Sequence, residues 1–194
     1  MGDVILKSIT LSSLEERYLE LSSSLVRTPT VKLTSPFLID LIKASQIYLK
    51  LECFQYSGTF KARGALSVAK QIPEKDKKFG ITAASAGNHA IAAAWAAKVE
   101  NLSAKVVMQT SANPFRISLA KTFGAEIIMK EGGVATFAEA DKLMREERRT
   151  FIHPFDGLDT TLGTAGVGLE LIEDCTELDA VVVAVGGGGL ISGV

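Results

Sequence analysis

The stretch GITAASAGNHAIAAAWAAKVENLSAKVVMQ, residues 80–109, holds two apolar runs separated by an alanine-rich segment. The runs GITAA (80–84) and AKVVMQ (104–109) resemble buried strands, and the segment around Trp95 has a helical pattern. A strand, a helix and a second strand in this order are typical of a parallel sheet covered by helices.

The same alternation extends in both directions along the chain. Further strand-like runs are IYLKLE, AEIIMK, TFIH and DAVVVAV, at 47–52, 125–130, 150–153 and 179–185. Helical patterns separate most of them, so we predict an α/β fold with parallel sheets flanked by helices. Ser12 or Ser13 is expected to cap the first helix. Asn113, followed by Pro114, is expected to start a later helix that Gly124 ends.

Composition limits the possible partners. The 194 residues are 47% hydrophobic and 22% charged, which suffices for a buried core in one domain or two small ones. The formal net charge is −1 at pH 7, which gives no general attraction to phosphate backbones or anionic lipid. We therefore expect neither nucleic acid nor a membrane as a partner.

The cysteine pattern and the chain start bear on the compartment. Cys53 and Cys175 lie far apart and show no metal-ligand spacing, so we expect core thiols in a reducing compartment and no metal site. No basic region followed by an apolar run opens the chain, and no apolar stretch reaches membrane-spanning length. The predicted location is cytoplasmic.

Ligands of parallel α/β folds bind beyond the carboxyl ends of strands, and three loops occupy such positions. GGGG, residues 186–189, follows an apolar run, and its N–H groups can turn toward one anion; the alternative is a loose turn. SAGNHA, residues 85–90, opens a helix, with Ser85 as N-cap and first-turn N–H groups free for a carboxylate or phosphate. Asn88 and His89 could instead be simple capping and surface groups.

The third loop, SGTFKARGA (57–65), puts a lysine on an apolar stripe. In a helix over 59–72, Lys61 shares one face with Ala65, Val68, Ala69 and Ile72. Arg63 and Lys70 lie near the opposite side, where charges can stay hydrated. One interpretation is that Lys61 extends its ammonium to solvent along a crevice. The other is that burial and the helix N-terminus lower its pKa, which leaves an amine able to condense with a carbonyl.

Taken together, the three loops indicate one kind of ligand. A lysine amine, a glycine cradle for an anion and a second anion-binding helix start suit a phosphorylated aldehyde cofactor and a carboxylate substrate. Pyridoxal phosphate meets this description.

Four ordered motifs carry a resemblance to a known family. LKLECFQYSGTFKARGA, AASAGNHA, HPFD and AVGGGGL resemble the fold type II (tryptophan synthase β-like) pyridoxal-phosphate enzymes, closest to the group of threonine/serine dehydratases and serine racemases. RTPT at 27–30 is similar to an early segment of that group, so the match runs through nearly the whole chain.

The resemblance implies a role for each matching residue. Lys61 looks like the Schiff-base lysine that also removes the substrate α-proton, and Phe60 like the residue beside the cofactor ring. Asn88 matches the asparagine that hydrogen-bonds the cofactor 3′-oxygen. The implied substrate loop consists of Ser85, Ala86, Gly87 and His89, and the implied phosphate loop of Gly186, Gly187, Gly188 and Gly189.

The implied reaction is removal of the α-proton and β-hydroxyl of L-threonine or L-serine, which yields a 2-oxo acid and ammonia. Racemases of the group carry a serine at the position of Ala86. An alanine cannot transfer a proton, so the resemblance favours elimination over racemisation. A racemase, a β-replacing enzyme and a non-catalytic, self-associating fragment remain as alternatives.

Two departures from the family pattern affect this reading. DTTLGTAGVGLE, residues 159–170, stands where many relatives have GQGT, which leaves the substrate open. Relatives also continue well past the glycine loop, so we expect a truncated dehydratase of weak or lost activity. Residues 1–79 and 153–194 would form an incomplete large domain, and 80–152 a small domain. An exposed apolar edge of the large domain predicts a homo-oligomer.

Overall fold

The computed structural model describes residues 9–43 and 46–194. Its strands are β1 (Thr30–Lys32), β2 (Tyr48–Lys50), β3 (Ile81–Ala84), β4 (Ala104–Gln109), β5 (Glu126–Lys130) and β6 (Thr150–Phe151). Its helices are α2 (Leu11–Ser22), α3 (Pro36–Ile42), α4 (Lys61–Lys70), α5 (Glu74–Lys77), α6 (Asn88–Val99), α7 (Pro114–Thr122), α8 (Gly132–Glu147), α9 (Leu158–Thr164) and α10 (Gly166–Asp174), with 3-10 turns η1 (Glu52–Phe54) and η2 (Tyr56–Gly58).

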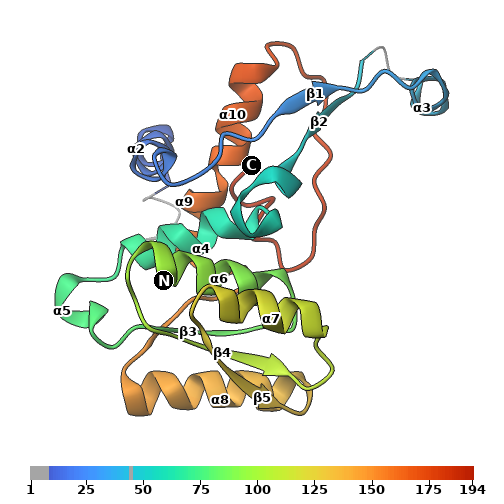
Figure 1. The fold of residues 1–194 in the computed structure, drawn as a ribbon. Coiled ribbons are helices and arrows are strands. Elements are labelled where there is room, and N and C mark those ends of the chain that lie inside the picture. Colours follow the sequence, from blue (N-terminus) through green and yellow to red (C-terminus); the bar gives the residue numbers. More distant parts are fainter. Residues whose placement is uncertain (1–8, 44–45) are drawn as a thin grey trace.

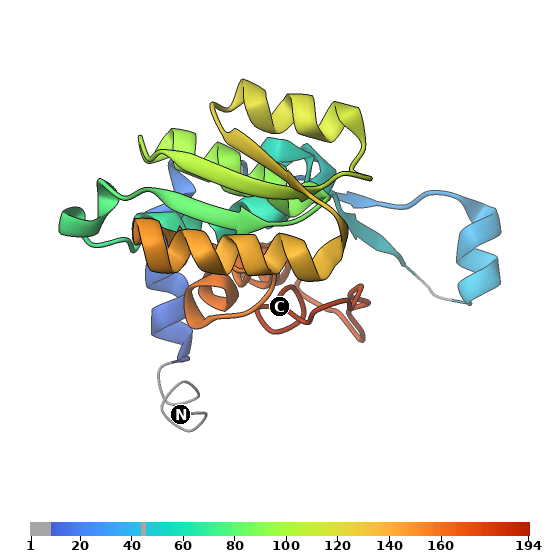
Figure 2. The ribbon, with the colours of Figure 1, turned by 90° about the horizontal axis from the view of Figure 1, so that it is seen from below.

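A parallel sheet of four strands forms the centre of the fold, in the order β5-β4-β3-β6. The helices α6 and α7 lie on one side of it and α8 on the other, as Figure 1 shows. Figure 2, seen from below, shows α8 lying across the sheet. The predicted α/β fold is confirmed, and the run 104–109 is a strand over its full predicted length.

Alternation along the strands decides which side chain meets which helix. Ile81 and Val106 belong to the core cluster on the α6 side, whereas Ala84 and Val107 pack with Ala140 on the α8 side. Successive side chains of a strand point to opposite faces, and helices cover both faces, so the central strand β3 is buried along its whole length.

The alanine-rich helix α6 lies at the centre of this core. Every residue from His89 to Ala97 is buried. The helix contacts the sheet, α7 and α4, and small side chains let these elements approach it closely. A helix that is apolar all round is expected in such a fully covered position.

The segment IYLKLE lies outside the parallel sheet. Only Tyr48–Lys50 forms a strand, and it pairs antiparallel with Thr30–Lys32. Figures 1 and 2 both show this two-stranded ribbon leading away from the sheet to α3. The prediction of a strand was right here, but its place in a parallel sheet was wrong, because a run of six residues does not reveal its pairing partner.

The predicted strand DAVVVAV is also wrong. Residues 179–185 form neither a strand nor a helix, and Val182 is 98% exposed. A strand is stabilised by hydrogen bonds to a neighbouring strand, and none lies beside this segment within the described residues. An apolar run alone therefore did not determine a strand.

Helix ends were predicted with mixed success. Asn113 caps α7 through its side chain, Pro114 follows it, and Gly124 lies just beyond the helix with a φ of +88°. The first helix, however, is capped by Thr10, whose side chain accepts from the Ser13 amide. The Thr10 amide in turn donates a hydrogen bond to the Ser13 hydroxyl. In this capping box a serine hydroxyl therefore accepts the bond that was predicted for a glutamate side chain.

The expectation that Arg63 would be hydrated is contradicted. Its side chain is fully buried and its guanidinium bonds Glu52 and Glu170, with N–O distances of 2.8–2.9 Å. Lys50 contacts the same Glu170 at 2.7 Å. Segments distant in sequence thus cover this side of α4 and supply the carboxylates that compensate the buried charge.

Two further expectations concern the whole chain. In the described residues, every helix is too short or too polar to cross a membrane. The sheet lies between residues 81 and 151, but the division into a large and a small domain stays a prediction.

Candidate active site

Lys61 is the first residue of α4, and its side chain does point inward. It is half-buried, and its ammonium donates a hydrogen bond to the carbonyl of Pro154. The Phe60 ring centroid lies 5.0 Å from Nζ. Lys61 forms no ion pair with any carboxylate of the described chain, and burial lowers the pKa of its amine.

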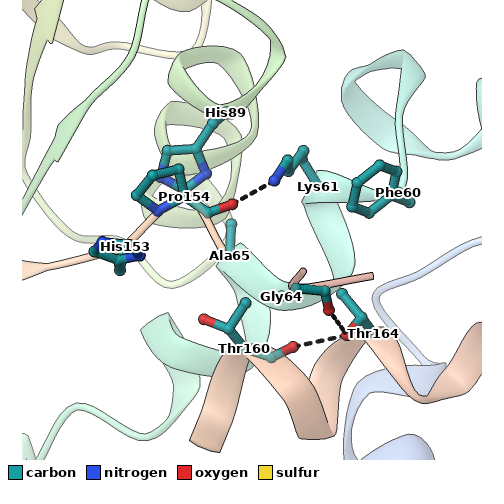
Figure 3. Close-up of a pocket in the computed structure, with 10 residues that line it drawn as sticks. Phe60, Lys61, Gly64, Ala65, His89, His153, Pro154, Thr160 and Thr164 are labelled. Carbon is teal, nitrogen blue, oxygen red and sulfur yellow. Dashed lines mark hydrogen bonds between the residues drawn. The ribbon is translucent and has the colours of Figure 1, made fainter. Parts of the chain in front are cut away.

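A small cavity lies beside this amine. Its volume is about 10 Å³, and Figure 3 shows the residues around it. They come from the start of α4, the start of α6, the segment after β6, α9 and the glycine loop. The lining residues are Phe60, Lys61, Gly64, Ala65, His89, His153, Pro154, Thr160, Thr164 and Gly189.

Two histidines beside the cavity are held by backbone groups. His89 is buried, and its Nε2 lies 2.8 Å from the Ile152 carbonyl, which requires a proton on that nitrogen. Burial lowers the pKa of His89 to about 4, with a smaller contribution from the nearby Lys61 charge. His153 accepts the Asp156 amide at Nδ1, and burial also lowers its pKa. Both rings are therefore neutral at pH 7.

The glycine loop packs against the segment that holds Lys61. A Cβ on Gly187 would overlap the Phe155 ring, and a Cβ on Gly189 would lie 2.6 Å from the Phe155 carbonyl oxygen. Gly188 has a φ of +89°, which favours glycine, whereas Gly186 has open space around it. Close approach thus requires glycine at positions 187 and 189.

The other predicted loop opens α6 and contributes His89 to this cavity. Ser85 was predicted as the N-cap, but Gly87 caps the helix, and the Ser85 hydroxyl accepts the Gly87 amide at 3.1 Å. Ala86 packs against the core. The first intrahelical bond is donated by Ala90, so the amides of Asn88 and His89 precede it.

Asn88 faces a second, larger space. This open groove has a volume of about 580 Å³ between the start of α6, α7 and the turn before α4. Its lining residues are Ser57, Gly58, Asn88, Ile91, Asn113, Phe115, Arg116, Leu119 and Phe123.

The predicted residues are therefore only partly brought together. Phe60, Lys61, His89 and Gly189 share the small cavity, whereas Asn88 lines the groove. His153, Pro154, Thr160 and Thr164 line the cavity without having been assigned a role. Because His153 and Pro154 lie in the loop directly after β6, the rule that picked out the other loops could have picked out these two residues.

Comparison with known proteins identifies the family. A model described as "Pyridoxal-phosphate dependent enzyme" matches residues 21–194. The chain belongs to this family.

Individual members of the pyridoxal-phosphate dependent family agree with this result. The chain is 44% identical to a phenylserine dehydratase of Ralstonia pickettii over 79% of its own length and 47% of the relative's. It is 35% identical to a catabolic L-threonine dehydratase of Staphylococcus aureus over 96% of its length and 54% of the relative's. The structure of maize serine racemase matches with a TM-score of 0.89 and 31% identity, over 96% of this chain and 56% of that one.

These matches confirm the resemblance and the fold type II architecture. The chain spans about half the length of the curated relatives it matches. The activity, substrates and partners of the whole protein are therefore taken up as proposals.

The side chains beside Lys61 fit pyridoxal phosphate in their chemistry. The amine lacks a carboxylate partner in the described chain, the loop 186–189 tolerates close approach, and Thr160 carries a buried hydroxyl without a hydrogen-bond partner. The space does not yet suit the cofactor, since about 10 Å³ holds about one water molecule.

Proposed function

We propose that the chain carries the cofactor site of an enzyme that eliminates the β-hydroxyl of a small hydroxy amino acid, L-threonine or L-serine, as water. Hydrolysis of the resulting enamine then releases ammonia and a 2-oxo acid. The observation that carries this proposal is the half-buried Lys61, which lacks a carboxylate partner within the described chain and has a lowered pKa. When bound, pyridoxal phosphate supplies an aldehyde for an amine and a ring that stabilises negative charge at the substrate α-carbon.

Lys61 is proposed to accept the α-proton of the substrate. A neutral amine is required for this, and burial favours that form. When the amine gains a proton, the Pro154 carbonyl can hold the ammonium. His89 is neutral and bonded to Ile152, so it adds no competing positive charge next to Lys61.

The remaining predicted residues are proposed as binding groups. Gly186–Gly189 would hold the phosphate, Asn88 would bond the ring oxygen, and Phe60 would pack beside the ring. The loop Ser85, Ala86, Gly87 and His89 would receive the substrate carboxylate through amides at the start of α6, where the helix dipole favours an anion.

A hydroxy amino acid with a larger apolar substituent is a second candidate substrate. The groove beside Asn88 is lined by Ile91, Phe115, Leu119 and Phe123. Such a surface suits an aromatic ring, and a phenylserine dehydratase is among the relatives. Racemisation is less well supported, because Ala86 carries no group that transfers a proton.

We also propose a cytoplasmic homo-oligomer. Cys53 and Cys175 are both free thiols, which suits a reducing compartment. Cys175 is buried as expected, whereas Cys53 is exposed, so the expectation of a core thiol was wrong there. The exposed apolar segment 179–185 offers unpaired backbone to a second copy.

The experiment adds pyridoxal phosphate to the purified chain and follows the visible absorbance. Borohydride is expected to fix the cofactor onto the peptide that contains Lys61, as read by mass spectrometry. Lys61→Ala should lose this adduct, whereas Lys70→Ala, a change of a partly exposed lysine at the other end of α4, should retain it. Incubation with L-threonine, L-serine and phenylserine, with detection of the 2-oxo acid, then ranks the substrates. No adduct at Lys61 would contradict the proposal.

A further inference from the structure

Arg116, on α7, is the charged side chain of the groove beside Asn88. The other residues that line this groove are apolar or uncharged, and none of them carries a carboxylate. The groove has a volume of about 580 Å³, so a small molecule has room next to the guanidinium. The groove therefore carries a positive charge that no lining side chain offsets.

Arg116 also differs from the other arginines of the chain. Each of the others pairs with an aspartate or glutamate at an N–O distance of 2.5–3.7 Å: Arg17, Arg27, Arg63, Arg145, Arg148 and Arg149. Arg116 has neither an ion pair nor a hydrogen bond to any residue that the structure describes. Water can satisfy an exposed arginine, so the position of the guanidinium decides whether it has a role.

The guanidinium of Arg116 lies against the predicted substrate loop. A Cβ on Gly87 would lie 3.4 Å from Nη1 of Arg116. Gly87 is the middle residue of the loop 85–89 and caps α6. Because glycine has no side chain, the guanidinium can lie close to the backbone of this loop. Arg116 thus brings a positive charge from α7 to the start of α6.

This position is unfavourable for a cation without an anion beside it. The amides of Asn88 and His89 precede the first intrahelical hydrogen bond of α6, and the start of a helix carries a partial positive charge. The helix start and the guanidinium therefore repel each other, whereas both attract an anion placed between them. The arrangement favours a carboxylate at this point, since the planar guanidinium can donate two parallel hydrogen bonds to it.

The same loop also borders the cavity at Lys61. Asn88 lines the groove, and its neighbour His89 lines the cavity together with Lys61. Consecutive Cα atoms are about 3.8 Å apart, so the two spaces adjoin this short stretch of backbone. The loop therefore lies between the side chain of Arg116 and that of Lys61.

We propose that Arg116 is a specificity-determining residue that binds the carboxylate of the substrate, together with the amides of the loop 85–89. The proposal rests on the proposed function, because it concerns the substrate of that reaction. The carboxylate keeps its charge while the α-proton and the β-hydroxyl leave. Arg116 therefore contributes to substrate binding and to the choice of an amino acid with a free carboxylate.

The first experiment uses acetate as the probe and the full chain without cofactor. Acetate is titrated at constant ionic strength, and the amide signals of Gly87, Asn88 and His89 are followed by NMR. Arg116→Gln removes the charge and should weaken acetate binding about tenfold, because charge-assisted hydrogen bonds are lost. Lys121→Gln removes a positive charge from an exposed position of the same helix outside the groove, and should leave acetate binding unchanged.

The second experiment tests whether the bound carboxylate is that of the substrate. The cofactor-loaded chain is titrated with L-threonine and with L-threoninamide, which lacks the carboxylate, and the visible absorbance is followed. Arg116→Gln should raise the half-saturating concentration about tenfold for L-threonine and leave that for L-threoninamide unchanged. Arg116→Lys keeps the charge without the planar fork and should recover part of the loss. Circular dichroism checks the fold of each variant.

Equal acetate binding by Arg116→Gln and the parent would overturn the proposal, and so would a parent that does not respond to acetate. An equal loss of affinity for L-threonine and L-threoninamide would also overturn it, because Arg116 would then act on the shape of the groove and not on the carboxylate. The acetate titration does not involve the cofactor. A failure of the borohydride experiment and a failure of this proposal are therefore distinguishable.

Discussion

Lys61 and Arg63 lie two residues apart on α4. The helical spacing of apolar residues predicted the inward orientation of Lys61 but not the burial of Arg63. The apolar stripe correctly turned Lys61 inward, because that stripe is local to the helix. Arg63 is buried because Glu52 and Glu170 reach it from other elements. Helix periodicity contains no information about such remote partners.

Candidate residues could be predicted where a motif was contiguous. Phe60, Lys61 and His89 followed from two short stretches, and they do meet at one cavity. Thr160 could not be found in this way, since an unpaired hydroxyl is a property of what surrounds it and not of its own sequence.

Burial of His89 makes folding sensitive to acid. Its pKa is about 4 in the folded chain against an ordinary value of 6.5. Between these values the unfolded chain binds a proton that the folded chain does not, so stability falls as pH drops from 6.5 toward 4. The contribution of this one group is about 3 kcal/mol.

His89→Gln keeps an amide donor near the Ile152 carbonyl and removes the titration. Urea unfolding at pH 7 and at pH 4 should therefore show a smaller loss of stability in the variant than in the parent. Carboxylates such as Glu170 add their own acid dependence to both proteins, so the difference between the two is the quantity to compare. If the free energy of unfolding fell equally with pH in the variant and the parent, the low pKa assigned to His89 would be contradicted.

At the scale of elements, α4 and α9 pack closely because Gly163 has no side chain. A Cβ there would lie 2.6 Å from the Arg63 carbonyl oxygen and 2.6 Å from the Ser67 Cβ. Gly163→Ala should separate the two helices that wall the cavity and cost about 1–3 kcal/mol in urea unfolding.

Gly133→Ala on α8 is the matched control. Its nearest neighbour would be the Gln109 side chain at 3.6 Å, an ordinary contact, and alanine favours the helix. This variant should be neutral or more stable by up to about 1 kcal/mol. Equal losses in both variants would show that the contact between α4 and α9 is not the cause.

Strands could be predicted from apolar runs where the folded chain also supplies a neighbouring strand for each run. The runs 80–84, 104–109 and 125–130 became β3, β4 and β5 with their ends within one residue, because each pairs with a neighbouring strand. DAVVVAV has the same composition without a neighbouring strand, so its composition gave a wrong prediction.

For the whole molecule, the segment 179–185 is the expected site of self-association. Val182 is 98% exposed and lies in an apolar stretch that is not paired in a sheet. Val182→Lys should reduce concentration-dependent association in light scattering without a loss of stability, because its side chain makes few contacts to lose.

Val134→Lys serves as the control, since Val134 is 89% exposed on α8, far from this segment in the sequence. It should leave association unchanged. A parent protein that scatters as a monomer at all concentrations would contradict the proposed homo-oligomer.

The buried Arg63 cluster has a consequence for the order of events during synthesis. Glu52 precedes Arg63 by 11 residues and leaves the ribosome first, whereas Glu170 follows it by 107. Until Glu170 emerges, the Arg63 guanidinium can pair with Glu52 alone. Burying this side of α4 at that stage would leave the positive charge of Arg63 incompletely compensated. The helix that presents Lys61 therefore gains its final support late, from the last helix of the nascent chain described here.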